Sequence, residues 1–170
     1  MTDHLIDVVN EKDEVIGKEL KSKKFELGFI SRVVAIIVRD SNGKIIVCKR
    51  GPHKTVDANM LDLSAFGNVD AGENYEQAAQ RELWEETGIK SPVKMLDKFY
   101  LENIHGDKKI KLFCGIFLTK SDEEPKLSHE VVSFKRMSVD ELEKDMKKHP
   151  EIYCQGFIKD FNLVKNKLKL

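Results

Sequence analysis

The sequence predicts an α/β fold in which a β-sheet is flanked by helices, and two observations lead to this prediction. Short runs rich in Val and Ile, bounded by Gly, Asn and Asp, recur along the chain, as is typical of strands. Other segments carry capping residues and apolar positions at helical spacing. At 170 residues, one hydrophobic core suffices. We therefore expect a single domain with an N-terminal hairpin extension (1–28), a core (30–150) and a C-terminal helix (151–170).

Three pairs of strand-like runs predict three hairpins. The runs are residues 5–9 and 15–20, residues 31–39 and 44–49, and residues 99–103 and 110–118. The first pair flanks a polar turn, the second a turn that ends in Asn42-Gly43, and the third a turn at residues 105–108. Each pair therefore favours two antiparallel neighbours in a sheet.

The last third of the chain predicts one more strand and two helices. An apolar run at residues 131–137 favours a late strand. Ser138 and the acidic residue three positions later, Glu141, form a capping-box pattern, which marks the start of a helix. Phe157, Phe161, Val164 and Leu168 recur at helical spacing and predict a closing amphipathic helix.

A glycine-rich loop followed by a helix with three glutamates stands in the middle of the chain. Asn74 is a good N-cap with Gln77 in the capping-box position, and Gly88 is the expected left-handed residue after the helix. The glutamates are Glu82, Glu85 and Glu86.

These glutamates stand at i, i+3 and i+4, so on a helix of about 100° per residue their carboxylates lie over one face. Like charges at this spacing destabilise a helix, so we expect a cation there. Mg²⁺ fits best and Mn²⁺ is a second candidate, because hard cations prefer carboxylate oxygens and keep sites for water and phosphate. The alternative is a solvated helix face, with Arg81 and Glu85 as an ordinary i, i+4 pair.

The stretch from Gly67 to Ile89 resembles the Nudix box: Gly, five residues, Glu, seven residues, Arg-Glu, an apolar residue, any residue, Glu-Glu, any residue, Gly, apolar. The resemblance implies a Nudix-type α/β/α sandwich with a mixed sheet. It implies Mg²⁺-dependent hydrolysis of a diphosphate bond in a nucleoside diphosphate linked to another moiety, or in a related small molecule. It makes three glutamates catalytic metal ligands, with the Gly67 carbonyl as a further ligand: Glu82, Glu85 and Glu86. Glu73 and Arg81 take a supporting role, as a bidentate pair that clamps the loop to the helix.

Beyond the box, the chain is similar to the Nudix subgroup related to isopentenyl-diphosphate isomerase. The likeness rests on four segments: residues 6–17, residues 48–50, Lys54 and residues 61–64. Isomerisation of a five-carbon diphosphate is therefore a rival activity. The resemblance requires a cysteine before the box glycine and a metal-binding histidine after it, where this chain has Phe66 and Asn68. These two departures disfavour isomerase activity. A non-catalytic nucleotide-sensing module is a third reading, although all three box glutamates are present.

Further residues are candidates for substrate binding and proton transfer. Arg50 and Lys54 could neutralise a diphosphate, or they could be solvated loop cations. Phe66 is an aromatic that could contact the substrate. Glu82 or Glu85 could act as general base, or a carboxylate from the loop at residues 121–130. We choose Glu130 in that loop, since its other glutamates could equally face solvent.

Composition narrows the range of partners. The 29 basic and 29 acidic residues give a formal charge of zero, which argues against long nucleic acid. No apolar run approaches the ~20 residues that cross a bilayer, and the first residues do not resemble a signal peptide, so we expect a cytoplasmic protein without a membrane partner. Cys48 and Cys114 lie in apolar runs and predict buried thiols. The N-terminal hairpin could pair with a second copy in a homodimer.

Overall fold

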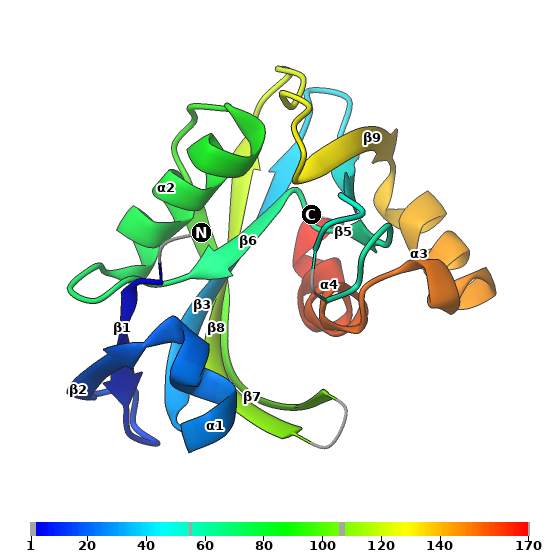
Figure 1. The fold of residues 1–170 in the computed structure, drawn as a ribbon. Helices are drawn as coiled ribbons and strands as arrows, with labels where there is room; N and C mark the ends of the chain where they lie inside the picture. The colour runs from blue at the N-terminus through cyan, green and yellow to red at the C-terminus, as the bar shows by residue number, and fades with distance from the viewer. Residues whose placement is uncertain (1–2, 55, 106–107, 170) are drawn as a thin grey trace.

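The computed structural model describes residues 3–54, 56–105 and 108–169, and within these ranges a nine-stranded sheet carries helices on both faces (Figure 1). The strands are β1 (Leu5–Val9), β2 (Val15–Leu20), β3 (Ile30–Arg39), β4 (Ile45–Arg50), β5 (Leu61–Asp62), β6 (Ala65–Asn68), β7 (Lys94–His105), β8 (Lys108–Lys120) and β9 (Val131–Met137). The helices are α1 (Lys24–Leu27), α2 (Tyr75–Thr87), α3 (Val139–Lys148) and α4 (Gln155–Leu168), with short 3₁₀ turns at Lys21–Lys23 and Pro150–Ile152.

Strand β3 organises the sheet. It runs parallel to β8 over ten residue pairs, from Ile30↔Lys111 to Arg39↔Lys120, and antiparallel to β6. Its hairpin with β4 is confirmed, but the two strands pair only at Arg39↔Ile45 and then separate. β4 continues with β9 and β5 instead. The sheet is therefore mixed. Where β3 and β4 separate, β6 pairs with β3 and β5 pairs with β4.

Both faces of the sheet are covered, which confirms the predicted α/β/α sandwich. Alternate residues of a strand point to opposite faces. On β3, Val34 and Ile36 belong to the apolar cluster that includes α2, whereas Ala35 and Ile37 belong to the cluster that includes α3 and α4. The near-continuous apolar run of β3 follows from this double burial.

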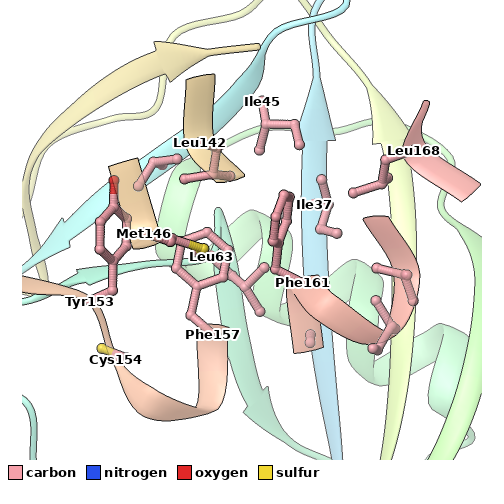
Figure 2. Close-up of a cluster of buried hydrophobic side chains, with 14 of the residues drawn as sticks. Ile37, Ile45, Leu63, Leu142, Met146, Tyr153, Cys154, Phe157, Phe161 and Leu168 are labelled. Carbon is pink, nitrogen blue, oxygen red and sulfur yellow. The ribbon is translucent and has the colours of Figure 1, made fainter. Parts of the chain in front are cut away.

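The larger of the two clusters lies beneath α3 and α4, as Figure 2 shows. Phe157 and Phe161 from α4 pack beside Leu142 and Met146 from α3, and all four are buried. Burial of each such side chain contributes about 1.5–3 kcal/mol relative to exposure. The predicted closing helix is confirmed, because its four apolar positions are all buried.

The N-terminal hairpin is confirmed and joins the sheet through the pair Val9↔Ile30. Its turn is fixed to the rest of the molecule by Asp13, which has a positive φ of 63°. The Asp13 carboxylate accepts hydrogen bonds from Arg32 Nε (2.6 Å) and from the Tyr75 hydroxyl (3.0 Å) and pairs with Lys98. This ionic contact holds the extension against β3, β7 and the start of α2.

The structure also differs from the sequence-based expectations. β7 begins at Lys94 rather than at residue 99, and the expected turn at residues 105–108 falls partly on residues 106–107, which lie outside the described ranges. The short strands β5 and β6 and the helix α1 were not expected. β6 is four residues long and contains Gly67 and Asn68, which have low strand propensity, so its pairing with β3 rather than local preference makes it a strand.

Two further expectations concern the thiols and the membrane. Cys48, Cys114 and Cys154 are free and buried, which confirms the expected burial of the two strand thiols. Across the described residues, the helices are too short or too polar for any of them to cross a bilayer.

Candidate functional site

The helix α2 begins and ends as predicted. The Asn74 side chain accepts a hydrogen bond from the Gln77 backbone N–H (2.8 Å), and the Gln77 side chain accepts one from the Asn74 backbone N–H (2.9 Å). Gly88 closes the helix with a left-handed φ of 70°. Ala79 and Leu83 are buried against the sheet, so the opposite side of α2 is left to carry polar groups.

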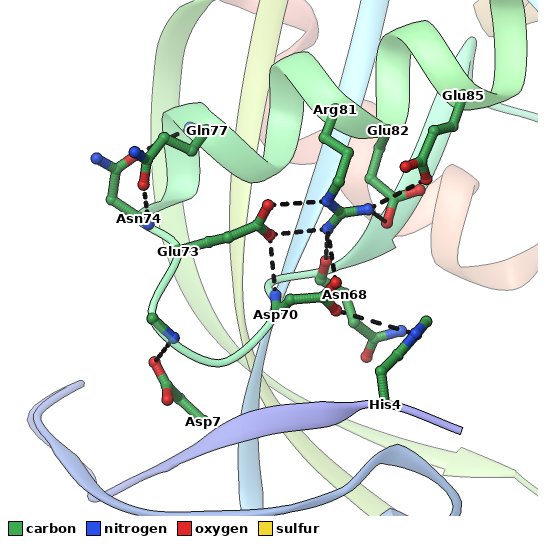
Figure 3. Close-up of polar contacts among 11 residues, drawn as sticks. His4, Asp7, Asn68, Asp70, Glu73, Asn74, Gln77, Arg81, Glu82 and Glu85 are labelled. Carbon is green, nitrogen blue, oxygen red and sulfur yellow. Dashed lines mark hydrogen bonds and ion pairs between the residues drawn. The ribbon is translucent and has the colours of Figure 1, made fainter. Parts of the chain in front are cut away.

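Arg81 links the loop to the helix (Figure 3). Its Nε and Nη2 donate to the two carboxylate oxygens of Glu73, each at 2.8 Å, and Nη2 also donates to the Asn68 carbonyl at 2.9 Å. Glu73 in turn accepts from the Asp70 backbone N–H at 3.0 Å. The hydrogen bonds from Arg81 hold the pKa of Glu73 below its usual value. The structure thus brings the expected bidentate pair together and fixes the loop by it.

Two of the three box glutamates contact Arg81, and the third contacts the backbone of Phe66. Glu82 accepts from Arg81 Nη1 at 2.7 Å, and Glu85, which is 55% exposed, lies 3.3 Å from the same nitrogen. Glu86 accepts from the Phe66 backbone N–H at 3.0 Å.

The ordinary i, i+4 pair between Arg81 and Glu85 is therefore present. Within residues 3–54, 56–105 and 108–169, no group of three or more His, Cys, Asp or Glu side chains is gathered closely enough to hold a metal ion. Arg81 Nη1 keeps the carboxylates of Glu82 and Glu85 together, whereas the Glu86 carboxylate accepts from the Phe66 backbone N–H.

Partial burial raises the pKa of two of these carboxylates. It raises the pKa of Glu86 to about 7, with a further contribution from the charge of Glu82, although the Phe66 N–H opposes the rise. Burial also raises the pKa of Glu82. A carboxylate that is costly to ionise in the protein alone is stabilised by a nearby cation. The donor set, hard carboxylate oxygens on one helix, fits Mg²⁺ or Mn²⁺.

Because Gly67 has no side chain, it leaves the space that the Glu82 carboxylate occupies. A Cβ built on Gly67 would fall on the Glu82 carboxylate, well inside the 3.0 Å below which real Cβ contacts essentially do not occur. The φ of Gly67 is not in the left-handed region, so the requirement for glycine comes from this close approach alone. The first glycine of the motif therefore lets a helix carboxylate contact β6.

Two basic residues, Arg50 and Lys54, lie at the end of β4 and just after it, near the box glutamates. Lys54 Nζ lies 3.4 Å from Glu130 and 4.0 Å from Glu86. Arg50 donates to Asp62 (2.8 Å) and to the Val56 carbonyl (3.2 Å). Both side chains are only about one-fifth exposed, so neither is a solvated loop cation. The structure places Glu130, through Lys54, beside Glu86.

A pocket of about 350 Å³ lies on the other face of β6. Phe66 and Asn68, which alternate with Gly67, line it together with Arg50. Sequence reasoning missed two other contributors, Lys24 from α1 and the buried Asp160 from α4. The available signal for Asp160 was its position, three residues after Phe157, on the face of α4 that the apolar pattern predicts to be buried.

Comparison with known proteins places the chain in a family. The model of the NUDIX domain matches residues 30–155. The chain belongs to the NUDIX domain family.

Two curated relatives and one solved structure illustrate this membership. A Nudix hydrolase of Deinococcus radiodurans is 38% identical over 90 residues, which span 53% of this chain and 53% of that protein. The chain thus spans about half the length of that relative. The Isopentenyl-diphosphate Delta-isomerase 2 of Photorhabdus laumondii is 28% identical over 162 residues, 94% of this chain and 92% of that protein. The crystal structure of DR0079 from Deinococcus radiodurans superimposes with a TM-score of 0.71 at 27% identity, covering 85% of this chain and 90% of that one. The resemblance to the Nudix box is thereby confirmed at the level of the family.

Proposed function

We propose that this protein hydrolyses a diphosphate bond in a nucleoside diphosphate linked to another moiety, or in a related small molecule, with Mg²⁺ as cofactor and Mn²⁺ as a substitute. The observation that carries the proposal is the pair of largely buried carboxylates of Glu82 and Glu86 on α2. Gly67 in the loop before this helix leaves room for the Glu82 carboxylate at β6. Lys54 stands opposite, 4.0 Å from Glu86, and the charge of Arg50, which pairs with Asp62, also interacts with that of Glu86. Opposed acidic and basic groups suit a metal-bound diphosphate.

The metal would be held by Glu82, Glu85 and Glu86, with the Gly67 carbonyl as a further ligand. When bound, Mg²⁺ lowers the pKa of a coordinated water and offsets the charge that develops on the leaving phosphate. Arg81 holds Glu82 and Glu85 on the same side of α2, since one nitrogen contacts both. Glu85 is the most exposed of the three and is free to turn toward a cation.

Glu130 is our choice for the general base. Its carboxylate lies 3.4 Å from Lys54 Nζ, and Lys54 also lies 4.0 Å from Glu86. Glu130 is therefore next to the box glutamates. A diphosphate that recruited Lys54 would release Glu130 to accept a proton from water. Glu82 and Glu85 remain alternative bases. Arg50 and Lys54 would bind the phosphates, and Phe66 the organic part.

Isomerisation of a five-carbon diphosphate is the rival that the Photorhabdus relative favours. It needs an acid and a base in contact with carbon. The residues at the two reacting positions are Phe66, which is apolar, and Asn68, which does not titrate, and both line the pocket. We therefore favour hydrolysis over isomerisation, and over a module that binds nucleotides without turnover.

The test is a panel of nucleoside di- and triphosphates, nucleotide sugars, dinucleotides and isopentenyl diphosphate, each assayed with and without Mg²⁺ for cleavage of its diphosphate bond by chromatography of the products. The comparison is wild type against Glu86→Gln, with Glu76→Gln, an exposed glutamate in the first turn of the same helix, as the matched control. We expect Mg²⁺-dependent cleavage that Glu86→Gln abolishes and Glu76→Gln leaves intact. Nucleotide binding without cleavage of any compound would instead support the sensing module.

We also propose a homodimer through β2, an edge strand of the sheet in the described residues. Val15 and Ile16 on this strand are at least half exposed. Exposed apolar side chains on an unpaired edge favour pairing with a second copy. A change from dimer to monomer in Ile16→Lys, measured by light scattering, would support it. The zero formal charge argues against long nucleic acid as a partner.

A further inference from the structure

Strand β1 of the N-terminal hairpin holds the loop that precedes α2. The Ala71 N–H donates to the Leu5 carbonyl at 2.9 Å. The Gly72 N–H donates to the Asp7 carboxylate at 3.3 Å (Figure 3). Between these two acceptors, Ile6 pairs with the loop as an antiparallel bridge. The N-terminal extension therefore contacts the Nudix box directly.

Asp7 is an unusual residue for its position in β1. It is only 4% exposed, and a buried carboxylate costs free energy unless hydrogen bonds or opposite charges compensate for it. Aspartate also has a low propensity for strands. Its carboxylate accepts from the Gly72 N–H and lies 3.9 Å from Arg32 Nη1. These two partners account for a carboxylate at this position, and the loop amide is the nearer of them.

The turn of the same hairpin fixes the first residue of α2. The Tyr75 hydroxyl donates to the Asp13 carboxylate at 3.0 Å, and the Arg32 guanidinium lies 5.4 Å from the centre of the Tyr75 ring. Arg32 Nε also donates to Asp13, at 2.6 Å. The loop is therefore held on both sides of Glu73, at residues 71–72 by β1 and at Tyr75 by the hairpin turn.

Glu73 connects this loop to the glutamates of α2. Its carboxylate accepts two hydrogen bonds from Arg81. Arg81 Nη1 in turn lies 2.7 Å from Glu82 and 3.3 Å from Glu85. Residues that orient metal ligands without touching the metal typically contribute about 10–100-fold to metal affinity or activity. A series of direct contacts thus runs from β1 to two of the candidate metal ligands.

We propose that Asp7 is a positioning residue for metal binding, because its hydrogen bond to Gly72 holds the loop in the conformation in which Arg81 presents two box glutamates to a divalent cation. The part about the cation rests on the proposed function, whereas the part about the loop does not. Asp7 contacts neither metal nor substrate and acts through Glu73. A residue of the N-terminal extension, outside the box, is thereby part of the site.

Hydrogen exchange of the Gly72 amide, followed by NMR, measures the loop without metal or substrate. Asp7→Ala removes the acceptor, whereas Asp7→Asn keeps an acceptor oxygen. We expect the exchange rate of this amide to rise about tenfold in Asp7→Ala, the effect of losing one hydrogen bond to a charged partner. In Asp7→Asn the rate should stay much closer to that of wild type. Exchange in Asp7→Ala at the wild-type rate would overturn the proposal.

Binding of Mn²⁺ to the protein alone, measured by electron paramagnetic resonance, tests the consequence for the metal site. We expect Asp7→Ala to weaken Mn²⁺ binding about tenfold and Asp7→Asn to restore most of the affinity. Glu19→Ala is the matched control, because Glu19 lies on β2 of the same hairpin and its carboxylate accepts from the Leu20 N–H rather than from the loop. Urea denaturation of each variant measures stability separately. If Asp7→Ala is less stable but binds Mn²⁺ as tightly as wild type, Asp7 has a structural role only and the proposal is wrong.

A double-mutant cycle tests whether Asp7 acts through Arg81. Arg81→Lys loses the bidentate pair with Glu73, so the further change Asp7→Ala should weaken Mn²⁺ binding by less than about twofold in that background. Equal tenfold effects of Asp7→Ala in the two backgrounds would contradict a route through Arg81.

Failure of this inference is distinguishable from failure of the proposed function. Wild-type protein that binds no Mn²⁺ would count against the proposed function, and the exchange rates of the Gly72 amide would still decide whether Asp7 holds the loop. Tight Mn²⁺ binding that Asp7→Ala leaves unchanged would refute the positioning role and leave hydrolysis standing.

Discussion

Replacing Gly67 with alanine should separate catalysis from stability. The added Cβ would fall on the Glu82 carboxylate, whereas ordinary van der Waals contact begins near 3.4 Å. The atoms it meets are the end of a flexible side chain, so Glu82 can move away by about 1 Å or more without displacing the backbone. Because a misplacement of about 1 Å in a catalytic group costs about 100-fold in rate, kcat/KM should fall by that factor. The free energy of unfolding should change by only about 1 kcal/mol, since the contact at stake is one part-buried hydrogen bond between Arg81 and Glu82.

The assay combines kcat/KM on the best substrate of the panel with urea denaturation of the same samples. Gly17→Ala is the matched control, because a Cβ at Gly17 meets nothing within 4 Å and the residue lies in β2, away from the site. We expect it to keep wild-type activity. Wild-type kcat/KM in Gly67→Ala would refute the reasoning that the glycine exists to admit Glu82. A loss of several kcal/mol in stability would refute the claim that only the side chain moves.

Three further predictions concern stability and reactivity. Arg81→Lys loses the bidentate pair with Glu73, and urea denaturation should show a loss of roughly 1.5–3 kcal/mol. Burial raises the folded-state pKa of Asp160 from 3.8 to about 7, so the free energy of unfolding falls as pH rises through this window. Asp160→Asn should therefore be more stable at pH 8, by at most about 4 kcal/mol, and the gain should vanish near pH 4; an equal gain at both pH values would contradict this. Burial raises the pKa of Cys48 to about 12, so a thiol reagent should label it only after unfolding, and labelling of the native protein would count against its burial.

The parts of the structure that could be predicted from the sequence are those fixed by local interactions. The caps of α2 and α3 depend on residues three positions apart, and both capping boxes are present. The burial of Phe157 and Phe161 follows from helical spacing. The same holds for the Glu73–Arg81 pair, since both residues lie within one loop-helix unit. In each case the residues lie so close together in the sequence that the local backbone geometry determines the contact.

The parts that could not be predicted depend on pairings between distant segments. β6 exists because β3 pairs with it, and only Phe66 among its four residues has a high strand propensity. The pocket joins α1, β6 and α4, so no spacing along the chain indicates it. The hydrogen-bond partners of the three box glutamates could not be predicted either. Helical spacing places the glutamates on one face, but it does not indicate that Glu82 and Glu85 contact Arg81 while Glu86 contacts the Phe66 N–H.

The central claim is that the box glutamates direct water onto a diphosphate bond. Reaction of the preferred substrate in ¹⁸O-labelled water with Mg²⁺, followed by mass spectrometry of the products, tests it most directly. We expect one ¹⁸O atom in one phosphate-containing product, and no label above background with Glu86→Gln. A product of unchanged mass and rearranged carbon skeleton would contradict hydrolysis, and label incorporation that persists in Glu86→Gln would contradict the role given to these glutamates.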